Sequence, residues 1–252
     1  MDKTLVKGLN LLEELAKSRD PKGVAELART LGWSKSNVHR LLQTLVECGY
    51  VSSEGGRYWA GLKLWSLGSR VVARTDVRQA AQPFLEKLAQ ASQETVHLSI
   101  LERYEVVYVD KIDSPQPIRA YSEIGGRAPA YCVATGKAML AFQPPEVIEQ
   151  LSGHLVRHSP NTITDPERLA AEFATIRTNG YSVNQGEWRQ QVSGIGAPIR
   201  DSSGNVVAAL GISGPSERFT KSALRKLAPL VCQAAENVSS NLGAPHRQGD
   251  IP

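Results

Sequence analysis

The 252-residue sequence predicts an α+β protein of two domains, and three observations lead to this prediction. Residues 1–49 carry three successive segments with the apolar spacing of helices. Residues 50–59 then read as two short strands around a pair of glycines, the pattern of a β-hairpin. From residue 95 onward, pairs of strand-like segments mix with helices without regular βαβ repetition, which indicates an α+β sheet domain.

The three N-terminal helices have clear boundaries. The first must stop before Pro21, because proline cannot continue a helix. The second covers Val24–Leu31 and ends at Gly32, and one residue later Ser34 is a good N-cap for the third, which ends at Gly49. The apolar side chains that the third helix turns to the core are Val38, Leu41, Leu42 and Leu45. Two helices joined by so tight a turn, followed by a hairpin, form a winged helix-turn-helix.

The hairpin and the segment after it set the domain boundaries that we expect. Gly55 and Gly56 supply the positive φ angles of a tight turn between the two wing strands. Residues 62–74 return to helical spacing, and another helix follows over 77–91, where Pro83 must kink the helix or mark its true start. We therefore predict a DNA-binding domain over residues 1–62, a linker helix over 63–76 and a larger domain over 77–252. The tail after about residue 243 is expected to be disordered.

The larger domain contains two predicted strand pairs and two long helices. The predicted elements are strands at Thr95–Leu101 and Tyr104–Asp110, a helix from Pro166 to Gly180, strands at Ser193–Arg200 and Val206–Ser213, and a final helix from about Leu224 to Val238. Asp165 is a favourable cap and Pro166 a favourable first residue for the first of these helices. A further helix is expected to open at Ala134 and to reach Phe142.

Charge and cysteine usage narrow the functional classes. Residues 1–70 carry 11 Lys or Arg against 7 Asp or Glu, whereas the remaining residues carry 18 of each. This basic excess suits a phosphate backbone as the partner of the first domain. Cys48, Cys132 and Cys232 lie too far apart for a zinc knuckle or a disulfide framework. The sequence has no apolar run of membrane length and no signal-peptide core, so we expect a cytoplasmic protein without membrane contact.

The third helix presents hydrogen-bonding side chains on the face that does not enter the core. These side chains are of the kinds that contact base edges and phosphates, and they gather toward the end that enters the major groove. The predicted DNA-contacting residues are Ser34, Lys35, Ser36, Asn37, His39, Arg40, Gln43 and Thr44 on this helix, Arg57 and Tyr58 on the wing, and Lys63 after it. An alternative is a winged helix used only for protein contacts, with a larger domain that merely dimerises.

At this point the sequence resembles the IclR family of bacterial regulators. The stretches that carry the resemblance are Leu31–Leu45, Gly49–Val51, Arg57–Leu64, Gly125–Ala141 and Gly186–Pro215, in the family's order. The resemblance implies a GAF-like effector-binding domain and a homodimer, often a dimer of dimers, on a near-palindromic double-stranded operator. It also implies a ligand-responsive repressor or activator rather than an enzyme, without a cofactor.

The resemblance further implies where the effector binds. Matched by motif, the ligand-binding positions are Ala128, Ala134, Thr135, Asn184, Val192, Gly194, Gly211 and Ser213, with Pro117 and Ala120 in a lid. Free backbone N–H groups where the helix opens at Ala134 suit a carboxylate. Asn184, Gly194 and Gly211 stand where keto-acid-binding members carry Asp, Cys and Ser, so we expect a bulkier organic acid, such as a sugar acid or an aromatic acid. Alternatively, the two glycines allow close strand packing, and Glu187 braces a loop.

An enzyme is the rival class. His154 and His158 have the spacing of two metal ligands on a helix, but the glutamate of an HExxH motif and a third ligand are absent from the sequence around them. Cys132 has no assignable histidine partner, and the chain contains no GxSxG motif. Lys137 follows a glycine as in a phosphate-binding loop, but Tyr131 and Ala138 break that pattern. We therefore expect no catalytic residues and no metal site.

Overall fold

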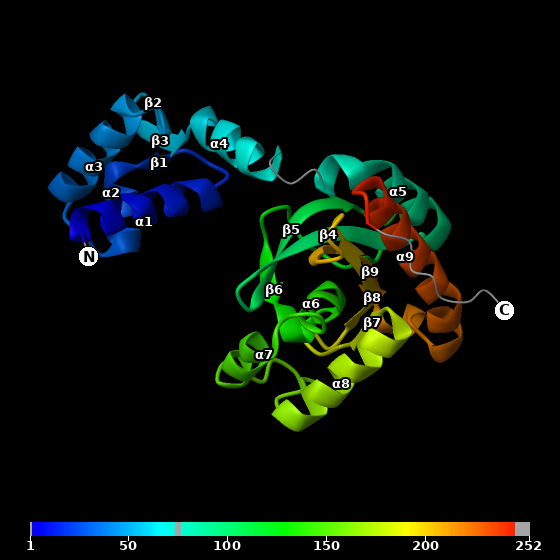
Figure 1. The fold of residues 1–252 in the computed structure, drawn as a ribbon. Coiled ribbons are helices and arrows are strands. Elements are labelled where there is room, and N and C mark those ends of the chain that lie inside the picture. The colour runs from blue at the N-terminus through cyan, green and yellow to red at the C-terminus, as the bar shows by residue number, and fades with distance from the viewer. Residues whose placement is uncertain (1, 74–76, 245–252) are drawn as a thin grey trace. The chain divides into compact units, whose positions relative to one another are not determined.

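The computed structural model describes residues 2–73 and 77–244, and the chain divides into two compact units, residues 1–74 and 75–252 (Figure 1). The predicted linker helix corresponds to α4, Leu62–Ala73, and the end of the predicted linker, residues 74–76, lies outside the described residues. The tail predicted to be disordered begins at about residue 243, and its residues after 244 also lie outside the described residues. Within the described residues, no helix combines the length and the apolar character that a membrane span requires.

The first unit is the predicted winged helix-turn-helix. Its elements are α1 (Lys3–Lys17), β1 (Lys22–Gly23), α2 (Val24–Leu31), α3 (Lys35–Glu47), β2 (Val51–Glu54), β3 (Arg57–Ala60) and α4. The strands form a small antiparallel sheet in the order β1-β3-β2. The two-residue turn of the wing is made by Gly55 and Gly56 at φ angles of 58° and 74°, which side chains other than glycine rarely adopt.

Helices α1, α2 and α3 of the first unit pack around one apolar core. Leu11 and Leu15 of α1, Leu27 of α2, and Val38 and Leu42 of α3 are all buried. These residues recur at helical spacing, so each helix presents a single apolar face to the other two. Burial of that face fixes which side of α3 remains exposed to solvent.

The second unit is built on a six-stranded antiparallel sheet. Its elements are α5 (Val77–Ser92), β4 (Thr95–Glu102), β5 (Glu105–Ile112), β6 (Arg127–Pro129), the 3-10 turn η1 (Ala130–Cys132), α6 (Ala134–Leu140), α7 (Pro145–Ser152), α8 (Pro166–Asn179), β7 (Ser182–Gln185), β8 (Val192–Arg200), β9 (Val206–Pro215), the 3-10 turn η2 (Ser216–Arg218) and α9 (Lys221–Asn241). The strand order is β6-β5-β4-β9-β8-β7. This confirms the predicted α+β class.

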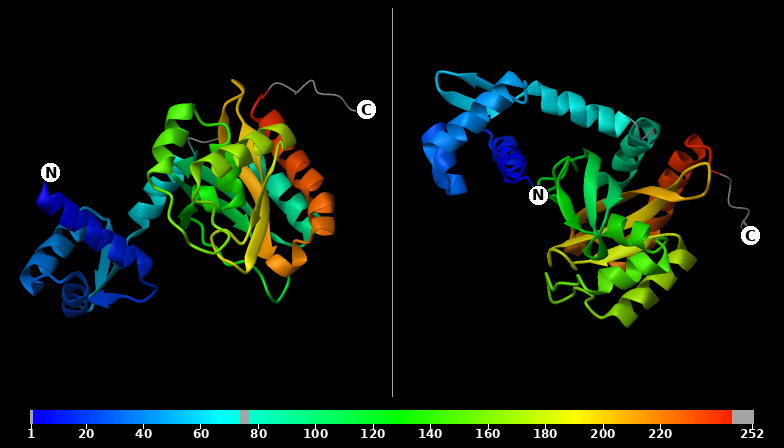
Figure 2. Two further views of the ribbon diagram at one scale, coloured as in Figure 1. Left: turned by 90° about the horizontal axis from the view of Figure 1, so that it is seen from below. Right: turned by 60° about the vertical axis from the view of Figure 1, so that its left-hand side comes forward.

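Helices cover both faces of this sheet, which Figure 2 shows from two further sides. On one face, α5 and α9 pack side by side over β4, β8 and β9, through residues such as Leu85 and Val231. On the other face, α6 and α8 enclose a second core that includes Met139 and Phe173. Because α6 packs directly on β8 and β9, the residues at its N-terminal end lie close to the sheet.

Several local expectations need correction. Pro83 lies inside α5, which begins at Val77, so this proline does not mark the helix start. The helix at Ala134 ends at Leu140 instead of reaching Phe142. The stretch from His154 to His158 is not helical, so the two histidines do not share a helix face. The strands β1, β6 and β7 and the helix α7 were not predicted, because each is short and none has a strong apolar period.

Candidate functional site

The exposed face of α3 carries most of the predicted DNA contacts. Ser34 caps the helix, and its Oγ accepts a hydrogen bond from the backbone N–H of Asn37 at 3.4 Å. The predicted residues of this face are exposed except for Asn37, which is half-buried. Lys35 and Arg40 take part in none of the ion pairs formed among the described residues. The structure therefore leaves the charged groups of this helix available to a partner, whereas Ser34 and Ser36 lie within hydrogen-bond distance of each other and Thr44 donates to the carbonyl of Arg40.

The three predicted contacts outside α3 are engaged within the first unit. Arg57 donates to the backbone carbonyl of Pro21 at 3.2 Å and lies 3.5 Å from a carboxylate oxygen of Glu26. Tyr58 is half-buried and packs against the core. Lys63 donates to the carbonyl of Cys48 at 2.8 Å, so it neutralises the C-terminal end of α3. The roles of these three residues in DNA contact stay predictions, and any such role has to be shared with these internal contacts.

The second unit contains a small cavity, here called the sheet cavity, between the sheet, the start of α6 and two loops. Its volume is about 50 Å³, and its walls are formed by His97, Tyr108, Ala120, Tyr121, Ser122, Val133, Ala134, Thr135, Asn184, Trp188, Arg189, Val192, Gly194, Ile195, Ile212 and Ser213. Most of the predicted ligand-binding residues meet here: Ala134, Thr135, Asn184, Val192, Gly194 and Ser213. Ala120 of the predicted lid also lines the cavity, whereas Pro117 does not.

Two predicted ligand-binding residues lie elsewhere. Ala128 pairs with Val106 across β6 and β5 and packs into the core between α6 and α8. Gly211 is buried between neighbouring elements, because a Cβ atom there would lie 2.5 Å from the carbonyl oxygen of Ile195 and 2.8 Å from Cγ2 of Thr135. The alternative interpretation of this glycine, close packing of the strands, fits the geometry better than a place on the cavity wall.

The same constraint applies at Gly194, although this residue does line the sheet cavity. A Cβ atom at Gly194 would lie 2.5 Å from the carbonyl oxygen of Ile212 on the adjacent strand. The space that a side chain would occupy at either glycine is therefore filled by backbone of the protein itself. The sequence-based inference that these glycines enlarge the pocket for a bulkier acid is not supported by this packing.

His97 is the polar centre of the sheet cavity, and the sequence did not single it out. Its Nε2 lies 2.6 Å from Oγ of Ser213 on β9, and its Nδ1 lies 3.3 Å from Oγ of Ser122. Its ring stacks obliquely on Tyr108 at 5.0 Å. Burial lowers the pKa of His97 to about 4, and the nearby positive charge of Lys111 is the smaller cause of this shift. At neutral pH the cavity therefore presents a neutral imidazole with one donor and one acceptor nitrogen.

Residues 186–191, here called the 186–191 turn, connect β7 to β8 and form another wall. Trp188 is half-buried in this wall, and the exposed guanidinium of Arg189 lies 4.6 Å from the centre of the indole ring. Asn184 supports the turn by accepting a hydrogen bond from the backbone N–H of Glu187 at 2.9 Å through its side-chain oxygen. Arg189 brings a positive charge to the wall of a cavity whose other walls are neutral, aliphatic or aromatic.

The loop between β5 and β6, residues 113–126, closes the sheet cavity through Ala120, Tyr121 and Ser122. Lys111 donates to the backbone carbonyl of Ser122 at 2.7 Å, and Arg218 donates to that of Ile118 at 3.0 Å. Further hydrogen bonds join Ser114 to Gln93 and Thr95, and Thr95 to the carbonyl of Ala120, whereas the side chains of Ile118, Tyr121 and Ile124 are exposed, so polar contacts rather than apolar packing hold this loop. Segments with little buried apolar surface generally open at a lower free-energy cost than the packed core.

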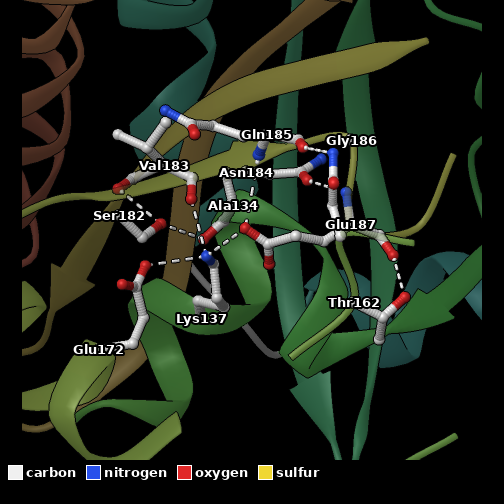
Figure 3. A network of polar contacts seen from close by, with 12 residues as sticks. Ala134, Lys137, Thr162, Glu172, Ser182, Val183, Asn184, Gln185, Gly186 and Glu187 are labelled. Carbon is white, nitrogen blue, oxygen red and sulfur yellow. Dashed lines mark hydrogen bonds and ion pairs between the residues drawn. The ribbon is translucent and has the colours of Figure 1, made fainter. Parts of the chain in front are cut away.

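Behind the cavity, Lys137 of α6 is completely buried, which is rare for a lysine. Figure 3 shows its ammonium group between Glu172, Glu187 and the backbone carbonyl of Val183. The sequence around Lys137 does not fit a phosphate loop, and for Glu187 it allows a role as the brace of a loop. The structure does place Glu187 as a brace, with its side chain turned toward Lys137. This partnership spans 50 residues, so no local motif could have revealed it.

Comparison with known proteins decides the family. The model of the IclR helix-turn-helix domain matches residues 4–55, and the model of the bacterial transcriptional regulator IclR C-terminal domain matches residues 69–240. The chain belongs to the IclR family. Its members are transcription regulators with a DNA-binding helix-turn-helix and a C-terminal effector domain, so this IclR-family chain is a DNA-binding regulator and not an enzyme.

Relatives match the IclR-family chain along nearly its whole length. The HTH-type transcriptional regulator KipR of Bacillus subtilis is 36% identical, covering 96% of this chain and 98% of KipR. The IclR structure from Thermotoga maritima is 33% identical with a TM-score of 0.81, covering 96% and 100%. An IclR homologue from Microbacterium hydrocarbonoxydans, solved in complex with 4-hydroxybenzoate, is 27% identical with a TM-score of 0.84, covering 95% and 99%.

The groups that suggested an enzyme have structural roles in this IclR-family chain. The ring of His154 stacks on Tyr104 at 4.9 Å, and Nε2 of His158 lies 3.2 Å from the hydroxyl of Tyr131. Cys132 is buried, and burial raises the pKa of its thiol to about 12, so it does not form the thiolate of a nucleophile. Among the described residues, His, Cys, Asp and Glu form no group suited to holding a metal ion.

Proposed function

We propose that this IclR-family regulator reads a near-palindromic operator with α3 and that its sheet cavity binds a small aromatic acid. The observation that carries the ligand class is the make-up of the walls, which combine the rings of Tyr108 and Trp188 with aliphatic residues and the one positive charge of Arg189. An aromatic ring suits such walls, and a carboxylate suits the guanidinium. The 4-hydroxybenzoate bound by the Microbacterium homologue is an acid of this class.

A sugar acid is the second candidate. His97, Ser122 and Ser213 line the sheet cavity and form a row of linked hydrogen-bonding groups. Such a row suits the hydroxyl groups of a sugar acid, because each group both donates and accepts at neutral pH. The two candidates share the carboxylate and differ in which wall they use, so one panel of acids separates them.

Binding of either acid requires the cavity to open. Ligand pockets commonly measure several hundred Å³, whereas the sheet cavity measures about 50 Å³, so it is small for an aromatic acid. The 113–126 loop, whose large apolar side chains Ile118, Tyr121 and Ile124 are exposed, is the wall that we expect to move. We therefore propose a closed and an open form of the second unit, with the acid binding only the open form.

Coupling to DNA follows if the two forms differ in how a homodimer spaces its recognition helices. A two-fold dimer presents two symmetry-related copies of α3, so the matching DNA target is a palindrome. The acid changes DNA affinity by as much as its own affinity differs between the two forms. Domain boundaries at residues 62 and 77 would leave α4 to transmit this change, and we propose a dimer or dimer of dimers as the working unit.

The ligand assignment is tested by isothermal titration of the full chain with 4-hydroxybenzoate, D-gluconate and pyruvate. We predict binding of 4-hydroxybenzoate, weakened about fivefold by Arg189→Ala, since an exposed charge pair contributes up to about 1 kcal/mol. Arg225→Ala, which removes an exposed arginine of α9, is the matched control and should leave the affinity unchanged. Tighter binding of gluconate would select the sugar-acid candidate, and binding of pyruvate alone would overturn both.

The alternative function, a winged-helix interaction module without ligand sensing, makes a different prediction. If the second unit only dimerised, none of a broad set of organic acids would bind and none would change DNA affinity. That result, obtained on a chain that binds its operator, would replace the proposed sensor by an interaction module.

A further inference from the structure

The side chain of Lys137 is fully used within the protein. Its Nζ donates to Oε1 of Glu187 at 2.8 Å, to Oε1 of Glu172 at 2.9 Å and to the carbonyl oxygen of Val183 at 2.7 Å (Figure 3). An ammonium group has three N–H donors, so all of them are satisfied. Two carboxylates from different elements thus share one buried positive charge.

The two carboxylates differ in what they hold. Glu172 lies on α8, its side chain is 31% exposed, and it forms no part of the sheet-cavity wall. Glu187 is 7% exposed and directly precedes Trp188 and Arg189, which line the cavity. The contact with Lys137 therefore ties the 186–191 turn to α6.

Both ends of the Lys137–Glu187 pair lead to a wall of the sheet cavity. On α6, Ala134 and Thr135 line the cavity within one helical turn of Lys137. On the turn, the backbone of Glu187 is held by Asn184 at its N–H and by Thr162, whose Oγ1 donates to its carbonyl at 2.6 Å. Trp188 of this turn also packs against the core around α6, and the side chain of Glu187 adds an ion pair to Lys137, so the pair is the polar link between the two walls.

Stability alone accounts poorly for this pair. Oε2 of Glu187 is buried and has no hydrogen-bond partner, and burial raises the pKa of this carboxyl. A buried ion pair with an unsatisfied oxygen seldom contributes net stability, because desolvation offsets the attraction. A group kept at such a cost calls for a positioning role.

We propose that Lys137 and Glu187 are positioning residues that hold Trp188 and Arg189 in the place where they contact the effector. The proposal rests on the proposed acid-binding function of the sheet cavity. Neither residue touches the effector itself, so they act on its affinity through the 186–191 turn.

The test compares Glu187→Gln with Glu172→Gln in the full chain. Each substitution removes one of the two negative charges around Lys137, but only the first acts on the cavity wall, which makes the second a matched control. We expect Glu187→Gln to weaken binding of 4-hydroxybenzoate about tenfold, as loss of supporting contacts does at other sites, and Glu172→Gln to change it less than about twofold.

A second readout reports the turn directly. Trp188 is the only tryptophan of the second unit, the others being Trp33, Trp59 and Trp65. In a chain labelled with 5-fluorotryptophan, the ¹⁹F resonance of Trp188, identified by Trp188→Phe, should shift or broaden in Glu187→Gln and stay in place in Glu172→Gln. The double variant Lys137→Met/Glu187→Met removes both charges of the pair, so it separates positioning from fold stability and should also bind weakly.

The outcomes are distinct. The proposal requires both the weaker binding and the changed resonance, and either change without the other overturns it, as does wild-type affinity in the double variant. If Glu187→Gln does not fold, the double variant is judged by the same two readouts. If the wild-type chain binds no acid of the panel, the proposed function fails, and the positioning role is then judged by the Trp188 resonance alone.

Discussion

At the scale of single residues, the sheet cavity depends on groups kept neutral by burial. His97 sits between Ser122 and Ser213, and the same burial that lowers its pKa to about 4 raises that of Tyr108 to about 12. Neither side chain is charged at neutral pH. The charge offered to an acid therefore comes from Arg189 at the wall, and selectivity comes from the neutral groups inside.

The lowered pKa of His97 predicts how stability depends on pH. The unfolded chain takes up a proton near pH 6.5, whereas the folded chain does so only near pH 4. The stabilising effect is therefore complete above pH 6.5 and is lost as the pH falls toward 4, by roughly 3 kcal/mol. Urea unfolding of wild type and of His97→Gln between pH 4 and 7.5 measures this directly. Equal slopes of unfolding free energy against pH in the two chains would contradict the assignment.

At the scale of elements, the close contact of α6 with the sheet is what places the cavity. Gly211 lets β8, β9 and α6 approach one another, since any side chain there meets the carbonyl of Ile195 and the methyl group of Thr135. From the sequence alone, this glycine in a strand has two explanations, a ligand-binding position or close packing of the strands. The structure favours packing, because the space is already filled.

This packing predicts the effect of a single methyl group. Gly211→Ala should lower the free energy of unfolding by about 1–3 kcal/mol, the usual cost of overpacking a closed core. Gly153→Ala is the control, because the nearest atom to a Cβ there is the carbonyl oxygen of Gln150, at an ordinary 3.6 Å. Thermal or urea unfolding followed by circular dichroism compares the two. An unchanged stability for Gly211→Ala would show that the strands and α6 have room to separate.

Elements with local signals were predictable from the sequence, and elements without them were not. The caps Ser34, Asp165 and Gly180, together with apolar periodicity, located α3 and α8 to within a residue or two. The two-residue strand β1 and the polar strand β7 carry no such period, since each depends on a distant partner strand. The pairing of Lys137 with Glu187 was hidden for the same reason.

The candidate pocket was predicted in part. Motif matching placed six of the eight ligand positions on the cavity wall but missed His97, Tyr108, Trp188 and Arg189. These four come from β4, β5 and the 186–191 turn, which meet only through the antiparallel pairing of the sheet. Short-range sequence patterns do not report such contacts, whereas the apolar spacing of α3 alone predicted which of its sides is exposed.

At the scale of the whole molecule, the chain separates two tasks. The excess positive charge lies in residues 1–70, where Lys35 and Arg40 are exposed, and the remaining residues balance. DNA binding by such a surface weakens steeply with added salt, because neutralised phosphates release counterions. The second unit contributes the sheet cavity, and the proposed regulation consists of the link between the two.

The central claim is tested most directly by fluorescence anisotropy of the full chain on labelled fragments of its upstream region, over a salt series and with or without 4-hydroxybenzoate. We predict tight, salt-sensitive binding to one fragment, an affinity that changes when the acid is added, and a loss of about tenfold or more with Arg40→Ala but not with Arg225→Ala. Uniform binding to genome-wide fragments that neither Arg40→Ala nor any acid alters would contradict ligand-responsive DNA recognition through α3.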